Sequence, residues 1–137
     1  MLNQFSRTEL LLGREAMDRL AASHVAVFGI GGVGGYTAEA LVRSGIGAID
    51  LIDDDKVCLT NINRQIYATR KTIGQYKVDA AAARITEINP DVVIDTHKTF
   101  YLPEVADQFD FSKYDYVVDA VDTVTAKLAL AEAATLA

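Results

Sequence analysis

A glycine-rich run joins an apolar segment to a helix-like segment near the start of the chain. It reads GIGGVG and contains Gly29, Gly31, Gly32 and Gly34. Glycine permits positive φ angles and lets a ligand approach the backbone closely. The start of the next helix offers unpaired N–H groups and a partial positive charge, which suit a phosphate. Because an expected strand precedes the run and an expected helix follows it, we predict a nucleotide-binding turn rather than a purely structural one.

An acidic cluster, Asp53 to Asp55, closes the next apolar run. Asp53 follows the glycine run at the distance where an acidic residue accepts hydrogen bonds from ribose hydroxyls. A solvated turn carboxylate is the alternative, and it suits Asp54 better. The glycine run and Asp53 alone do not distinguish NAD, FAD and ATP as the ligand.

Two cationic residues follow the acidic cluster. Arg64 lies in the polar stretch TNINRQ, and Lys77 begins the next helix-like segment. Two cations near one phosphate site favour neutralisation of a triphosphate over hydride chemistry. The alternatives are an ion pair between Arg64 and the acidic cluster, and a surface position for Lys77.

A second acidic site comes later, in the stretch DAVD. Asp122 is expected at the carboxyl end of a strand, where ligands bind in open α/β sheets. A carboxylate there could hold Mg²⁺, although Asp122 could also be the N-cap of the helix that follows. Asp119 lies inside the apolar run, and we expect it to orient nearby loops.

These side chains need elements that bring them together, and the hydrophobic pattern supplies them. Short apolar runs at residues 24–30, 48–52, 92–96 and 116–120 predict strands. Helices are predicted at about residues 9–22, 32–44, 77–88 and 123–136, with shorter irregular helix at 61–68 and 103–108. Alternating strands and helices imply right-handed crossovers. We therefore predict an α/β, Rossmann-like three-layer fold with a mainly parallel sheet.

Length and composition limit the possible functions. The chain has 137 residues and a formal net charge of −6, so we expect a single domain over residues 1–137. The negative charge argues against a broad basic face that grips nucleic acid. One cysteine excludes an internal disulfide within these residues. No transmembrane segment or signal peptide is apparent, so a cytoplasmic protein is expected.

Five motifs occur in order along most of the chain: GIGGVG, LIDDD, TNINRQ, GQYK and DAVD. Together they resemble the ThiF/MoeB/HesA superfamily, the relatives of ubiquitin-activating enzymes. The resemblance implies an ATP-dependent adenylating enzyme that uses MgATP to activate a carboxylate. Such relatives are longer and continue after the helix that follows Asp122, so this chain is expected to be the N-terminal, ATP-binding portion of a longer enzyme.

A finer resemblance is to the tRNA threonylcarbamoyladenosine dehydratases. It rests on DKVCLTNINRQI, on DAVDT followed by Lys127, and on the N-terminal FSRT. It implies cyclisation, a net dehydration, of threonylcarbamoyladenosine at position 37 of tRNA. The expected partners are tRNA, a second copy of the chain and sulfur-transfer proteins. The alternatives are activation of the C-terminus of a ubiquitin-like sulfur carrier, and nucleotide binding without catalysis.

The resemblance also implies how ATP and Mg²⁺ are bound. Gly31 and Gly32 bring the backbone to the nucleotide, Asp53 binds the ribose, and Asp122 is the metal ligand. The other residues expected around ATP are Gly29, Gly34, Asp55, Asn61, Asn63, Arg64, Gln65 and Lys77.

Four residues are expected to act in catalysis: Arg64, Lys77, Asp122 and Arg7. The first two and the metal would stabilise charge at the α-phosphorus. Arg7 would reach the ATP site of the other subunit, with a solvated terminal arginine as the alternative. Cys58 is expected to be a small buried packing residue, and His24 and His97 to have surface or capping roles.

Overall fold

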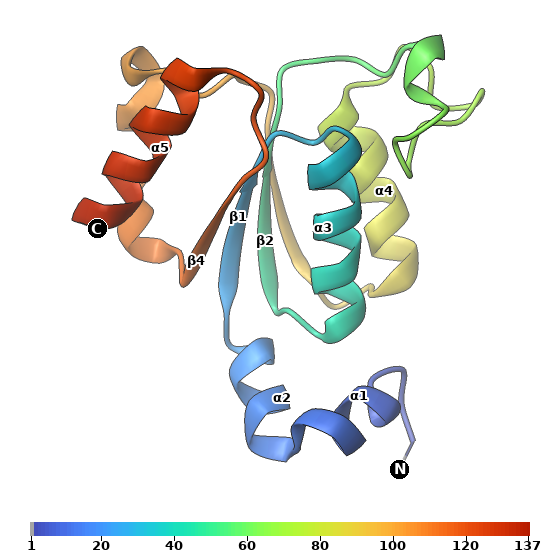
Figure 1. Ribbon diagram of the computed structural model, residues 1–137. Coiled ribbons are helices and arrows are strands. Elements are labelled where there is room, and N and C mark those ends of the chain that lie inside the picture. Colours follow the sequence, from blue (N-terminus) through green and yellow to red (C-terminus); the bar gives the residue numbers. More distant parts are fainter. Residues whose placement is uncertain (1) are drawn as a thin grey trace.

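The computed structural model describes residues 2–137 as a four-stranded sheet between two layers of helix (Figure 1). The strands are β1 (His24–Phe28), β2 (Ala48–Ile52), β3 (Val93–His97) and β4 (Tyr116–Asp119). Their order is β3-β2-β1-β4, and every pair is parallel. All the carboxyl ends of the strands therefore meet at one edge. This confirms the predicted Rossmann-like parallel fold.

Two helices cover one face of the sheet. They are α3 (Gly32–Ser44) and α4 (Lys77–Ile88), and the core beneath them contains Val27, Val42 and Ile49. Gly45 ends α3 in the left-handed conformation, with φ of 107°. The helix α4 is rich in alanine, the best helix former, and it ends at Ile88, because Asn89 is extended before Pro90.

The other face carries α5 (Val124–Leu136) and the crossover from β3 to β4 (Figure 1). That crossover contains two short 3-10 helices, Pro103–Gln108 and Phe111–Lys113. Phe28 of β1 packs there against Tyr101, Phe109 and Phe111, with ring centroids 5.2, 5.3 and 5.8 Å away. An aromatic core thus covers the face opposite α3 and α4.

The N-terminal region differs from the prediction of a single helix over residues 9–22. It forms two helices, α1 (Ser6–Leu12) and α2 (Arg14–Ala21), separated by Gly13. Gly13 has φ of 86° and ψ of 161°, which no helix can accommodate. Both helices lie at the amino edge of the sheet, opposite the carboxyl ends of the strands (Figure 1). Among residues 2–137, no helix is long and apolar enough to cross a membrane.

Candidate nucleotide site

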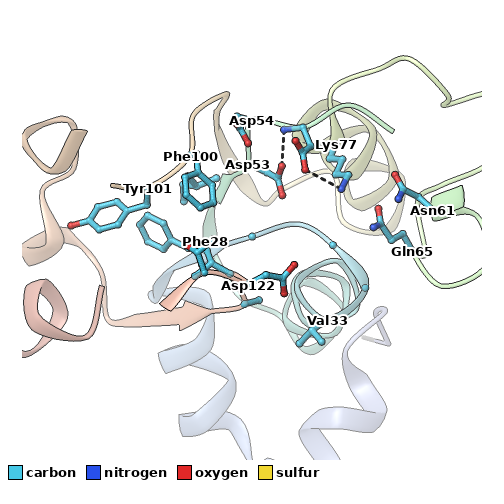
Figure 2. Close-up of a pocket in the computed structure, with 18 of the residues that line it drawn as sticks. Phe28, Val33, Asp53, Asp54, Asn61, Gln65, Lys77, Phe100, Tyr101 and Asp122 are labelled. Carbon is cyan, nitrogen blue, oxygen red and sulfur yellow. Dashed lines mark hydrogen bonds and ion pairs between the residues drawn. The ribbon is translucent and has the colours of Figure 1, made fainter. Parts of the chain in front are cut away.

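A pocket of about 630 Å³ lies at the carboxyl edge of the sheet (Figure 2). Its walls come from the segments that follow β1, β2, β3 and β4 and from the start of α3. This is the position at which open parallel α/β sheets bind ligands. Ten of the predicted ATP and metal residues line it: Gly29, Gly31, Gly32, Asp53, Asp55, Asn61, Arg64, Gln65, Lys77 and Asp122.

Two glycines of the turn, Gly29 and Gly34, lie where contacts leave no room for a side chain. Gly29 has φ of 91°, and a Cβ there would lie 2.5 Å from the carbonyl oxygen of Ala120. Gly34 does not line the pocket; a Cβ on it would lie 1.7 Å from the carbonyl oxygen of Gly29. Gly34 therefore lets α3 approach the turn closely. The first N–H groups of α3 are left without helical partners at the pocket wall.

Asp53 is fixed from both sides by backbone N–H groups. Its Oδ2 accepts from Ile30 and its Oδ1 from Asp55, each at 2.8 Å. Burial raises the pKa of Asp53, and these two hydrogen bonds act in the opposite direction. Each carboxylate oxygen can accept a further hydrogen bond, so Asp53 can receive the hydroxyls of a ribose.

Lys77 is the first residue of α4 and is only 8% exposed, so the alternative of a surface position is wrong. Its Nζ lies 3.6 Å from Asp55 Oδ2 (Figure 2). Among the described residues, Asp55 is the only ion-pair partner of Lys77. A buried ammonium with one distant partner favours a bound anion, because a charge away from water needs close hydrogen-bonded partners.

Arg64 is exposed, and its side chain packs over the glycine turn. A Cβ on Gly32 would lie 3.6 Å from Arg64 Cγ. The guanidinium Nη1 donates to the Thr60 carbonyl at 3.0 Å and to Asn63 Oδ1 at 2.9 Å. The alternative of an ion pair with the acidic cluster is therefore not formed within residues 2–137.

The two buried amides of the polar stretch face the pocket, but its third amide does not. Asn61 and Gln65 are 6% and 5% exposed, and Asn61 Oδ1 accepts from the Cys58 N–H at 3.0 Å. Asn63 instead lines a separate open hollow with Leu59 and Ile62. The turn bends Asn63 away from the pocket, so the prediction that it contacts ATP does not fit its position.

Asp122 follows β4 and lines the pocket as an exposed carboxylate (Figure 2). The N-cap of α5 is Thr123, so Asp122 does not take the alternative role of N-cap. Asp119 accepts from the Val121 N–H and from Lys127 Nζ, both at 3.2 Å. Asp119 thus orients the loop, as predicted, and Asp122 remains available to a ligand.

The sequence-based prediction did not include the apolar wall of the pocket. Phe28, Phe100 and Tyr101 line it on the side opposite Lys77 (Figure 2), and Val121 is a further apolar lining residue. We call residues 98–113 the wall segment, because Thr99, Phe100 and Tyr101 within it line the pocket directly after β3. The sequence did contain a signal for these residues. They follow a predicted parallel strand, and ligands bind at the carboxyl ends of such strands.

Three other expectations fall outside the pocket. Arg7 lies on α1, at the opposite edge of the sheet from the pocket of its own chain (Figure 1). Cys58 is exposed rather than buried, and it directly precedes the 3-10 helix Leu59–Asn61. A hydrogen bond with Thr60 lowers the pKa of its thiol. His24 and His97 are half-buried, and both hydrogen-bond to the buried Asp50 rather than cap a helix.

The parallel sheet, the close-packed glycine turn and the pocket at the carboxyl edge define a Rossmann-like α/β domain. The chain belongs to the ThiF family, whose family model matches residues 5–137.

Comparison with known proteins gives specific relatives. The chain is 51% identical over 130 residues to the tRNA threonylcarbamoyladenosine dehydratase of Bacillus subtilis, covering 95% of this chain and 51% of that protein. It is 40% identical over 126 residues to ubiquitin-like modifier-activating enzyme 5 of Drosophila willistoni, covering 82% of this chain and 30% of that protein.

The crystal structure of the Escherichia coli dehydratase TcdA in complex with ATP superposes with a TM-score of 0.90. It is 46% identical and covers 93% of this chain and 52% of that chain. The chain thus spans about half the length of the dehydratases it matches.

Proposed function

We propose that this chain is a single ATP-binding domain, over residues 1–137, of an enzyme that adenylates a carboxylate. In the whole protein, the carboxylate is that of threonylcarbamoyladenosine at position 37 of tRNA, and the net reaction is its cyclising dehydration. The observation that carries the proposal is the pocket, which joins the glycine turn, Asp53, Lys77 and Asp122. It lies in a chain 51% identical to a dehydratase of that name.

Each part of the pocket suits one part of ATP. The apolar wall formed by Phe28, Phe100 and Tyr101 would take the adenine base. Asp53 would accept hydrogen bonds from the ribose hydroxyls. The N–H groups at the start of α3, with Arg64 and Lys77, would bind the phosphates. This order along the pocket matches the order of the groups in the nucleotide.

The charges of the pocket favour Mg²⁺ as a companion of ATP. Four carboxylates and two cations line it: Asp53, Asp54, Asp55, Asp122, Arg64 and Lys77. A triphosphate would add to the excess of negative charge, so a divalent cation is needed. Asp122 is exposed, lines the pocket and makes no ion pair within residues 2–137, so its carboxylate can supply the oxygen ligands that Mg²⁺ prefers. When bound through Asp122, Mg²⁺ would neutralise negative charge on the phosphates.

The proposed reaction needs positioning and charge neutralisation more than proton transfer. A carboxylate oxygen of the substrate bonds to the α-phosphorus, and pyrophosphate leaves. Lys77 and Arg64 stabilise the charge on the phosphoryl oxygens as that bond forms. The neighbouring carbamoyl group then attacks the activated carbonyl carbon, releasing AMP and a proton. The nucleoside loses the elements of water while ATP becomes AMP and pyrophosphate.

The same proposal includes a homodimer and a cytoplasmic location. Arg7 lies far from its own pocket, so it would act on the pocket of a second copy. A tRNA substrate supports the cytoplasmic location. Sulfur-transfer proteins are candidate partners of the whole enzyme.

The test uses the full-length enzyme with MgATP and tRNA carrying threonylcarbamoyladenosine. After digestion, the mass of the nucleoside should fall by one water, and AMP should appear in equal amount. An unchanged mass, beside an active control dehydratase, would refute the dehydratase activity. ATP binding without AMP formation would leave only a nucleotide-binding protein.

A second candidate is activation of a ubiquitin-like protein, because the chain is 40% identical to an enzyme with that name. Both functions share the adenylation step, and the higher identity of 51% favours the dehydratase. Replacing tRNA by a ubiquitin-like sulfur carrier separates the two. Exchange of labelled pyrophosphate into ATP that depends on the carrier, and not on tRNA, would establish the second function.

A further inference from the structure

A buried carboxylate lies in the middle of the sheet, away from the pocket. Asp50 of β2 is 4% exposed, and its neighbours Ile49, Leu51 and Ile52 are apolar. A buried charge is unfavourable unless it is paired and hydrogen-bonded. An apolar residue at this position would form the same strand, so the strand itself does not require a carboxylate. The side chains that bind Asp50 therefore indicate its role.

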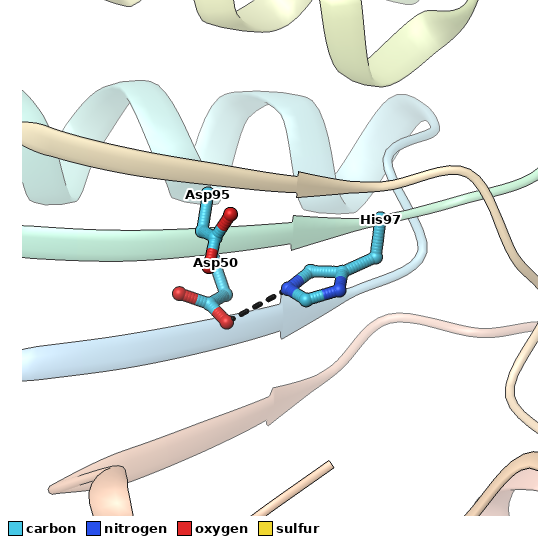
Figure 3. Close-up of side chains that lie close together, drawn as sticks. All are labelled: Asp50, Asp95 and His97. Atoms are coloured by element: carbon cyan, nitrogen blue, oxygen red, sulfur yellow. Dashed lines mark hydrogen bonds and ion pairs between the residues drawn. The ribbon is translucent and has the colours of Figure 1, made fainter. Parts of the chain in front are cut away.

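Three side chains converge on the Asp50 carboxylate. His24 Nε2 of β1 lies 2.6 Å from Oδ1, and His97 Nε2 at the end of β3 lies 2.9 Å from Oδ2. The Tyr114 hydroxyl donates to Oδ2 at 2.8 Å. Figure 3 shows the His97 ring pointing at Asp50, with Asp95 beside them. Both carboxylate oxygens already have partners and Asp95 is exposed, which favours a hydrogen-bonded cluster over a metal site.

His97 and Tyr114 flank the wall segment, residues 98–113. His97 immediately precedes it, Tyr114 immediately follows it, and both bind the same oxygen of Asp50. The rings of His97 and Tyr114 also pack against aromatic rings of this segment. The ring centroids of His97 and Phe109 are 5.1 Å apart, and those of Tyr114 and Phe111 are 5.9 Å apart. The first residues of the segment, Thr99 to Tyr101, line the pocket.

We propose that Asp50 is a positioning residue for the nucleotide pocket, whose carboxylate fixes both ends of the wall segment against the sheet. The inference rests on the proposed function, because it assigns the wall to the adenine nucleotide. Asp50 itself does not line the pocket. It acts through His97 and Tyr114, and their release frees the wall from its place beside Phe28.

The experiment measures hydrogen exchange and ATP binding in the 137-residue chain. Tyr114→Phe keeps the ring and removes one hydrogen bond, so the fold is retained. Exchange in residues 98–113 should rise about tenfold, while exchange in α3 and α4 stays unchanged. The dissociation constant for MgATP, measured by calorimetry, should rise about fivefold to tenfold. His97→Leu should give the same two changes.

Conservative and control variants separate positioning from general packing. His97→Gln keeps an N–H donor and, at a pH where the His97 ring of the wild type is neutral, should restore wild-type exchange and affinity. Tyr116→Phe alters an exposed tyrosine two residues along the chain and should change neither. Asp95→Asn, on the exposed carboxylate opposite Asp50, should also be silent.

Two results would overturn the inference. One is unchanged exchange in residues 98–113 for both Tyr114→Phe and His97→Leu. The other is a rise spread equally over the whole core, which is a general loss of stability. If wild-type protein does not bind MgATP, the proposed function fails instead, and the exchange pattern still decides whether Asp50 positions the wall.

Discussion

Lys77 carries the most specific expectation for a single residue, because its ammonium is buried at the pocket with Asp55 3.6 Å away. Lys77→Met keeps the aliphatic chain and removes the charge. ATP affinity should fall about 10- to 100-fold, since a desolvated charge-assisted contact to phosphate is lost. Calorimetric titration measures the loss. Lys71→Met, at an exposed loop position, should bind ATP as wild type does; equal affinity in the Lys77 variant would remove Lys77 from the phosphate site.

Asp122 should connect ATP binding to Mg²⁺. In wild type, MgCl₂ should tighten ATP binding relative to EDTA, and Asp122→Asn should lose most of that gain. The matched control is Asp107→Asn, on the exposed surface of the crossover. A full magnesium effect in the Asp122 variant would show that another oxygen holds the ion.

The pair His97 and Asp50 should make stability depend on pH. The hydrogen bond to Asp50 raises the pKa of His97 above 6.5, although burial opposes the shift. Burial would raise the pKa of Asp50, but hydrogen bonds from His97, His24 and Tyr114 outweigh it and lower that pKa below 3.8. The His97 contribution is therefore complete below pH 6.5 and is lost as pH rises through the folded pKa. The Asp50 contribution is present above pH 3.8 and is lost as pH falls through its folded pKa.

Urea unfolding of wild type and His97→Gln across pH 5 to 9 tests this linkage. The difference in free energy of unfolding should be largest near pH 5 to 6, of order 1 kcal/mol because the ring is partly exposed to solvent. It should shrink at higher pH. A difference that stays constant, or grows with pH, would contradict the shift in His97.

At the scale of elements, the contact between Gly34 and the turn after β1 should determine stability. A Cβ on Gly34 would lie 1.7 Å from the Gly29 carbonyl oxygen, so Gly34→Ala must push α3 away from the sheet. We expect a loss of about 1–3 kcal/mol or more. A Cβ on Gly32 would meet only Arg64, at 3.6 Å or more, so Gly32→Ala should change stability by less than about 0.5 kcal/mol. Similar unfolding midpoints for the two variants would show that the turn tolerates the shift.

Local pattern was enough to predict most of the elements and the residues that follow them. The apolar runs predicted all four strands, and the glycine turn and Lys77 lie at helix starts, where the sequence placed them. Asp50 was missed because its partners stand 26, 47 and 64 residues away, so only the register of the sheet brings them together. The break at Gly13 was missed because the apolar residues on both sides of it fit a single helix. The backbone angles of Gly13, which end α1, cannot be inferred from that pattern.

At the scale of the whole molecule, one edge of the sheet holds the pocket and the other holds α1. That helix carries large apolar side chains in water: Leu10 and Leu11 are 86% and 87% exposed. Such a cluster is typical of an interaction surface, and the proposed homodimer would cover it.

Sedimentation velocity over a range of concentrations tests the dimer. Wild type should shift towards dimer as concentration rises, and the double variant Leu10→Glu, Leu11→Glu should remain monomeric. Ile73→Glu, a similar change on an exposed loop, should associate as wild type does. A wild-type chain that stays monomeric at high concentration would count against a dimer of this chain.

The wall segment has one further property, which follows from its attachment at both ends to one carboxylate oxygen. His97 and Tyr114 hold the two ends of the segment together, whatever its length. In polymer terms, the segment is therefore a closed loop. The entropy of closing such a loop grows only with the logarithm of its length, about 0.6 kcal/mol for each doubling. Residues could therefore be inserted between Pro103 and Gln108 while the anchors hold. The pocket wall is thus a place where chain length can vary, and a new surface beside the nucleotide can arise, without rebuilding the sheet.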